Sequence, residues 1–141
     1  MKAIFVVFLC FAVFAPAVFS FNDYSDCGSQ AFSISSIGLS PEKVVREKQF
    51  NITVFGALKK DADKVQVGLE IKFNDTVLID KKSDLCKLVK TCPIKASNIS
   101  LPISAVLPKN SPAGQYQVRI SATNDKNEKI ICALVKINLD K

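Results

Sequence analysis

Cysteine is the residue type with the clearest chemistry in this 141-residue chain, which contains five of them. Cys10 lies in an apolar stretch near the start, and the others are Cys27, Cys86, Cys92 and Cys132. In an oxidising compartment four cysteines allow three disulfide pairings. The short spacing favours a local bridge between Cys86 and Cys92, which leaves Cys27 to pair with Cys132. A zinc site is disfavoured because these cysteines lack the paired C-x-x-C knuckles of structural zinc sites.

Catalytic chemistry is poorly supported, because the sequence contains no histidine. Its absence removes the usual general base, the usual metal ligand and every Ser-His or Cys-His nucleophile. A carboxylate pair of the glycosidase kind is the best remaining alternative. The candidate carboxylates, however, fall in charged turns or on the polar faces of expected strands: Asp61, Asp63, Glu70, Asp75, Asp80 and Asp84. We therefore expect that the protein is not an enzyme and uses no metal and no cofactor.

The first 20 residues have the order of a secretory signal peptide. Lys2 precedes an apolar run at residues 3–15, and small residues follow up to Ser20. Because the run is shorter than a comfortable membrane span of ~20 residues, we expect removal of this segment and no membrane anchor. Cleavage after Ser20 fits best, although residues 15–17 (Ala-Pro-Ala) offer a competing site. The remaining residues, 21–141, would then form one domain in the secretory pathway.

Three Asn-x-Ser/Thr sequons follow this segment, at Asn51, Asn74 and Asn98. An asparagine that carries a glycan must face solvent. Three sequons behind a signal peptide favour a glycoprotein that is secreted or resides in the lysosomal or endosomal lumen.

The elements that carry these residues have the pattern of strands. Residues 65–73 alternate apolar and polar side chains with a period of two, which predicts a strand with one buried face. Similar or weaker alternation occurs in six further runs: residues 32–37, 50–54, 77–79, 99–107, 116–123 and 130–139. Turn-forming residues separate the runs, and no stretch has a convincing helical period. The pattern predicts an all-β, two-sheet antiparallel sandwich, in which Pro102 places its strand at an edge or at a bulge.

Four local motifs give the chain a resemblance to a known family. They are Asp26-Cys27-Gly28, Asp84-Leu85-Cys86 with Cys92-Pro93-Ile94, Pro112-Ala113-Gly114-Gln115-Tyr116, and Cys132 in the last expected strand. In their order and cysteine spacing they resemble the ML domain family of lipid-recognition proteins, which includes phosphatidylglycerol/phosphatidylinositol transfer proteins and Niemann-Pick type C sterol carriers. The resemblance implies an immunoglobulin-like sandwich of seven strands, bridges Cys27–Cys132 and Cys86–Cys92, and a lipid held in a cavity between the sheets.

Two departures bear on the subgroup within this family. The sterol carriers have a third cysteine pair after the first strand, but residues 38–48 contain no cysteine. The phospholipid-transfer group usually has a second proline and a glycine here, and residues 42–47 contain neither. The missing cysteine pair favours the phospholipid-transfer group, whereas the missing proline and glycine depart from it. The resemblance implies a soluble carrier that transfers phosphatidylglycerol or phosphatidylinositol between membranes. A sterol carrier is the first alternative, and a filled sandwich that recognises a protein or a glycan is the second.

The apolar faces of the expected strands supply the candidate lining of the lipid cavity. These residues are Phe50, Ile52, Val54, Val67, Leu69, Ile71, Ile103, Tyr116, Val118 and Ile120. In any sandwich such residues can equally pack a filled core, so the sequence leaves both interpretations open.

Positive charge is concentrated around the predicted small disulfide loop. Five lysines face a single aspartate there, so this segment carries +4 of the net +5 of residues 21–141. The lysines are Lys81, Lys82, Lys87, Lys90 and Lys95. A basic loop can dock on anionic lipid headgroups, and a solvated loop is the plainer alternative. We expect transient contact with anionic membranes, no nucleic-acid partner, and a monomer, since a shuttle needs no second copy.

Overall fold

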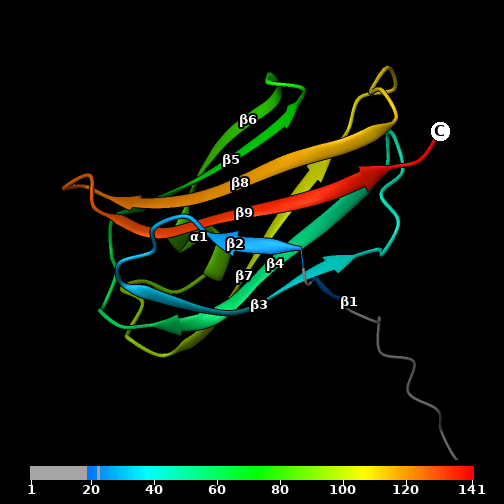
Figure 1. The fold of residues 1–141 in the computed structure, drawn as a ribbon. Coiled ribbons are helices and arrows are strands. Elements are labelled where there is room, and N and C mark those ends of the chain that lie inside the picture. Colours follow the sequence, from blue (N-terminus) through cyan, green and yellow to red (C-terminus); the bar gives the residue numbers. More distant parts are fainter. Residues whose placement is uncertain (1–18, 22) are drawn as a thin grey trace, which may run out of the picture.

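A computed structural model describes residues 19–21 and 23–141, which form two antiparallel β-sheets packed against one another (Figure 1). The expected signal segment lies outside the described residues, except for Phe19 and Ser20, which fall in the first strand. The proposed cleavage after Ser20 therefore falls within that strand, and it stays a prediction.

The two sheets contain four and five strands among the described residues. The smaller sheet has the order β1-β3-β4-β7, with β1 at Phe19–Phe21, β3 at Phe32–Ser40, β4 at Gln49–Leu58 and β7 at Asn98–Val106. The larger has the order β2-β9-β8-β5-β6, with β2 at Tyr24–Asp26, β9 at Lys129–Leu139, β8 at Gly114–Asn124, β5 at Val65–Phe73 and β6 at Thr76–Asp84. The predicted sandwich is confirmed: the seven expected runs correspond to β3–β9, and β1 and β2 are additional strands of three residues each.

The hydrophobic core lies between the sheets and follows from the alternation in the sequence. In β5 the even-numbered residues are exposed or half-buried, whereas the odd-numbered ones from Val65 to Ile71 are buried. The same rule buries one face of β4 and β8, and it places the large side chains of Phe50 and Tyr116 inside. Burial of these apolar faces is the main free-energy gain of the fold.

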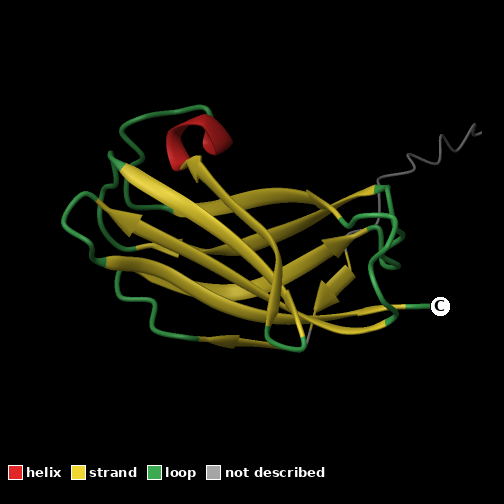
Figure 2. Cartoon of the chain, turned by 90° about the horizontal axis from the view of Figure 1, so that it is seen from above, coloured by secondary structure: helices red, strands yellow, loops and turns green. Residues whose placement is uncertain are grey.

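The prediction also lacks helix α1, Leu85–Val89, which lies at the end of the sandwich away from the C-terminus (Figure 2). Asp84 caps the helix, because its carboxylate accepts a hydrogen bond from the Cys86 N–H at 2.9 Å. Lys90 ends it in the left-handed conformation, with φ of 61°. A helix of five residues is too short to show the 3.6-residue period. No helix in the described part of the chain is long and apolar enough to cross a membrane.

Both disulfides favoured by the spacing are present. Cys27–Cys132 joins the end of β2 to β9 across 105 positions of the sequence. Cys86–Cys92 closes the loop that begins in α1. The edge position expected for Pro102 is also confirmed, because β7 is the outermost strand of its sheet.

Candidate functional site

The ten candidate lining residues lie together in the core between the sheets, and all are at least 93% buried. They come from β4 (Phe50, Ile52, Val54), β5 (Val67, Leu69, Ile71), β7 (Ile103) and β8 (Tyr116, Val118, Ile120). Their inward orientation agrees with the prediction. None of them lines the surface grooves described below, so the statement that they line a lipid cavity stays a prediction.

The sheets have free edges on the same side of the sandwich, at β6 and β7. These two edges lie close to each other, but in the described residues no backbone ladder joins them. Helix α1 and residues 90–97 connect them at one end. On the opposite side the chain itself changes sheets, since β1 ends at Phe21 and β2 begins at Tyr24. We call the facing edges of β6 and β7 the seam.

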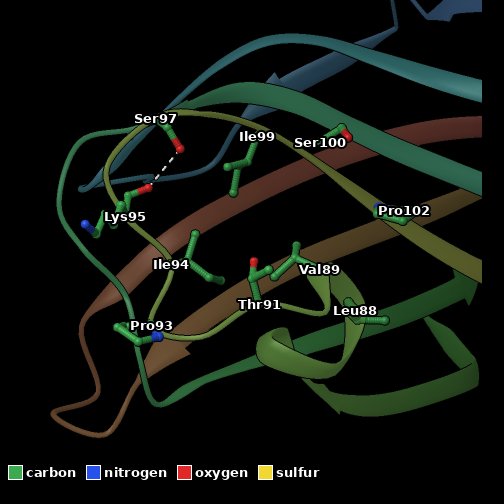
Figure 3. A pocket seen from close by; sticks show the side chains of 10 residues that line it. All are labelled: Leu88, Val89, Thr91, Pro93, Ile94, Lys95, Ser97, Ile99, Ser100 and Pro102. Atoms are coloured by element: carbon green, nitrogen blue, oxygen red, sulfur yellow. Dashed lines mark hydrogen bonds between the residues drawn. The ribbon is translucent and has the colours of Figure 1, made fainter.

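A groove of about 580 Å³ lies at the α1 end of the seam (Figure 3). Its walls come from α1, the disulfide loop and the first half of β7: Leu88, Val89, Thr91, Pro93, Ile94, Lys95, Ser97, Ile99, Ser100 and Pro102. The Ser97 hydroxyl donates a hydrogen bond of 2.9 Å to the Lys95 carbonyl, which fixes the loop at the rim. The groove mixes aliphatic and hydroxyl side chains, a composition that suits an amphipathic ligand.

A second groove of about 340 Å³ lies farther along the seam, and we call it the Lys81 groove. It is formed by Gln49, Ile79, Lys81, Ser104, Ala105 and Val106. The Lys81 ammonium donates a hydrogen bond of 2.9 Å to the backbone carbonyl of Ser104. This bond spans the seam, because Lys81 belongs to β6 and Ser104 to β7. Val106 is 46% exposed beside it, so the rim combines a cation with an exposed aliphatic side chain.

The five candidate docking lysines are all exposed, but they do not form one loop. Lys87 lies in α1, and Lys90 and Lys95 lie in the segment after it. Lys81 and Lys82 lie in strand β6, so the expected basic loop is divided between a strand and a loop. Docking of this surface on a membrane stays a prediction.

The three sequon asparagines are exposed, as glycosylation would require. Asn51 lies in β4, Asn74 in the turn between β5 and β6, and Asn98 at the start of β7. Whether they carry glycans stays a prediction.

Asp26, from the first family motif, organises the turn before Cys27. Burial acts to raise the pKa of its carboxyl, but the oxygen Oδ1 accepts hydrogen bonds of 2.8 Å from the backbone N–H groups of Gly28 and Ser29. These bonds, with help from the Ser29 hydroxyl, prevail and hold the pKa below its ordinary value. The carboxylate therefore has a structural role at the start of the domain.

Tyr116, from the third motif, ties the β7–β8 connection to the core. Its hydroxyl donates a hydrogen bond of 2.6 Å to the Pro112 carbonyl, in the manner of a tyrosine corner. Burial raises the pKa of Tyr116, against the opposing effects of a hydrogen bond with Ser111 and the charge of Arg46. Its ring lies 4.9 Å from that of Phe73, measured between centroids. Packing and this hydrogen bond thus explain the motif.

Three of the carboxylates considered as catalytic candidates have partners that give them a structural role, and Asp84, the cap of α1, is one of them. Asp61 accepts a hydrogen bond from the Ala96 N–H at 2.8 Å, and Glu70 pairs with Lys72 at 3.3 Å. Asp63 lies near the sulfurs of Cys86 and Cys92. Those sulfurs form a disulfide and offer no thiolate to a metal, so this cluster does not suit one.

Comparison with known proteins gives concordant results. A family model described as the ML domain matches residues 22–139. The chain is 33% identical over 125 residues to putative phosphatidylglycerol/phosphatidylinositol transfer protein 2 of Dictyostelium discoideum, covering 85% of this chain and 88% of that one. It is 31% identical to a phosphatidylglycerol/phosphatidylinositol transfer protein of Aspergillus oryzae, covering 82% and 69%. Its fold matches the crystal structure of a Niemann-Pick type C2 protein from the Japanese carpenter ant, with a TM-score of 0.67, 22% identity and coverage of 83% and 98%.

Proposed function

Because the chain belongs to the ML domain family, we propose that it is a carrier that binds a phospholipid between its two sheets and transfers it between membranes. The names of the relatives from Dictyostelium and Aspergillus carry this proposal, since both names include the words phosphatidylglycerol/phosphatidylinositol transfer protein. The cargo that they suggest is an anionic glycerophospholipid.

The physical need for such a carrier follows from the cost of exposing acyl chains to water. At ~0.8 kcal/mol per methylene, some thirty methylenes cost on the order of 20 kcal/mol, so unassisted transfer is slow. An apolar interior that replaces the bilayer removes most of this cost and requires no covalent chemistry. The inner faces of β4, β5, β7 and β8 supply that apolar surface.

The cellular setting of the proposal is the secretory pathway. Two disulfides and three exposed sequon asparagines support a protein that is secreted or resides in the lysosomal lumen. Delivery involves brief contact with anionic membranes, and a monomer suffices for it. A sterol is the second candidate cargo, favoured by the fold match to the Niemann-Pick type C2 protein.

Native mass spectrometry tests the proposal. The secreted, deglycosylated protein is mixed with liposomes that contain phosphatidylglycerol, phosphatidylinositol, phosphatidylcholine and sterol. We expect one anionic phospholipid per chain, whereas a sterol adduct would assign the protein to the other subgroup. A bare mass under all conditions would contradict the carrier function and favour a filled sandwich that recognises a protein or a glycan.

A matched pair of variants on β8 tests the location of the lipid. Val118 is fully buried, and Val118→Trp adds a large side chain between the sheets. The neighbouring Gln117 is exposed, so Gln117→Trp adds the same side chain outside. We expect Val118→Trp to lose most lipid uptake and Gln117→Trp to retain it. Equal uptake by a folded Val118→Trp protein would show that Val118 does not face the lipid.

A further inference from the structure

Lys81 lies on the inner face of β6, where its neighbours on the adjoining strand are apolar. In the pairing of β5 with β6, Leu69 is opposite Lys81 and Ile71 is opposite Ile79. Residues directly opposite in an antiparallel pair point to the same face of the sheet. Leu69 and Ile71 are buried between the sheets, so the register directs the Lys81 side chain toward the interior side of the sheet edge. A cation thus occupies a position that the pattern of the strand would give to an aliphatic residue.

The neighbour of Lys81 in the chain has the opposite orientation. Lys82 is opposite Gly68 in β5, and both are on the outer face of the sheet. Both lysines are exposed, but Lys82 does not line the Lys81 groove. The two lysines therefore carry the same charge on the same strand, but only Lys81 is directed toward the interior.

Lys81 is exposed to solvent, and the hydrogen bond that it makes in the described residues is to a neutral group. Its hydrogen-bond partner is the neutral Ser104 carbonyl across the seam. In the described part of the chain, the ion pair present is that of Lys72 with Glu70, so Lys81 has no carboxylate partner there. A phosphate oxygen is a stronger partner for an ammonium than a carbonyl, because a charge-assisted bond is roughly twice as strong as a neutral one.

We propose that Lys81 binds the phosphate of an anionic phospholipid whose acyl chains lie between the sheets, and that it exchanges its bond to the Ser104 carbonyl for this contact. The inference rests on the proposed function and adds the residue that selects the headgroup. The headgroup would lie in the Lys81 groove, beside Gln49 and Val106 and at the edge of the apolar interior. Release of the Ser104 carbonyl at the same moment frees the two sheet edges to separate around the chains.

Three variants test this assignment. Lys81→Gln removes the charge and keeps a hydrogen-bonding side chain, Lys81→Arg keeps the charge, and Lys82→Gln removes an equal charge from the outer face. Each protein is mixed with vesicles of equimolar phosphatidylglycerol and phosphatidylcholine, and native mass spectrometry measures the ratio of the two bound lipids. The thermal unfolding midpoint of each protein confirms that it is folded.

We expect Lys81→Gln to reduce the ratio of bound phosphatidylglycerol to phosphatidylcholine several-fold, because the phosphate of phosphatidylcholine is already neutralised by its own choline ammonium and gains less from Lys81 than the phosphate of phosphatidylglycerol does. Lys82→Gln and Lys81→Arg should keep most of the wild-type ratio. An unchanged ratio in folded Lys81→Gln would overturn the assignment, as would an equal loss in Lys82→Gln, which would indicate general surface charge. A wild-type protein that binds both lipids without preference would overturn only the headgroup assignment, whereas one that binds neither would overturn the proposed function itself.

Discussion

Removal of the two disulfides one at a time should destabilise the protein by different amounts. The bridges span 105 and 6 positions of the sequence, so their loops differ greatly in length. In the chain-entropy relation a loop of about 100 residues contributes ~4.7 kcal/mol and one of about seven residues ~2.4 kcal/mol. We therefore expect the pair Cys27→Ala/Cys132→Ala to cost about twice as much stability as Cys86→Ala/Cys92→Ala.

Packing acts in the same direction as loop length. Cys132 is 1% exposed, so its truncation also leaves a small void, whereas Cys92 is exposed. With a urea dependence of ~1.5 kcal/mol per molar, the unfolding midpoint should fall by about 3 M for the long bridge and by about 1.6 M for the short one. The ratio of the two shifts does not depend on the exact slope.

Equilibrium unfolding in urea, followed by circular dichroism, measures both shifts. The proteins must be stripped of lipid first, because a ligand that binds only the folded state raises the midpoint by mass action. Wild-type protein with intact disulfides is the reference. A ratio of one or less would refute the reasoning, since it would mean that the local loop constrains the unfolded chain as strongly as the long one.

Three further substitutions have defined outcomes. Gly56→Ala should strongly reduce secretion yield and lower the thermal midpoint, because a Cβ at Gly56 would collide with the Ser33 carbonyl oxygen; a wild-type midpoint would contradict this. Tyr116→Phe should cost about 1 kcal/mol of unfolding free energy, the usual value of one hydrogen bond, through loss of the contact with Pro112, and a urea titration would detect it. Folding lowers the pKa of the Asp26 carboxyl from its ordinary value of 3.8, so the ionised form stabilises the fold at any pH above 3.8. This contribution is lost as the pH falls through the lower pKa of the folded state. The stability difference between wild type and Asp26→Asn should therefore shrink between pH 5 and pH 2, and a constant difference would argue against the role of the carboxylate.

The sequence predicts the main strands well, because the sheets are amphipathic and strand burial has a period of two. The run at residues 65–73 coincides with β5 at both ends, and Pro102 lies at a sheet edge as expected. The cysteine spacing was also sufficient to favour the observed bridges. Short elements were missed for a physical reason: α1 and β2 are held by capping and by pairing with distant strands, and neither leaves a periodic pattern.

The site is predicted less completely than the fold. The inward residues of β4, β5 and β8 follow from alternation, but whether they surround a cavity depends on the separation of the sheets, which no local pattern encodes. Charge alone groups Lys81 with the loop lysines, because charge carries no information about strand register. The two-residue period of a strand, taken from Ile79, directs the Lys81 side chain to the inner face. The contact with Ser104 cannot be predicted in this way, because it depends on a strand more than 20 residues away in the sequence.

The position of β9 has a consequence for the order of events during synthesis. This strand lies between β2 and β8, so the larger sheet stays split until nearly the whole domain has been made. Cys27 is among the first residues to emerge, and Cys86 and Cys92 follow long before Cys132. During that interval Cys27 can react with either of them, and the edge of β8 is open to other chains. Successful production of this protein should therefore depend on disulfide exchange that frees Cys27 from premature pairing, so that it can bridge to Cys132 once the final strand has inserted.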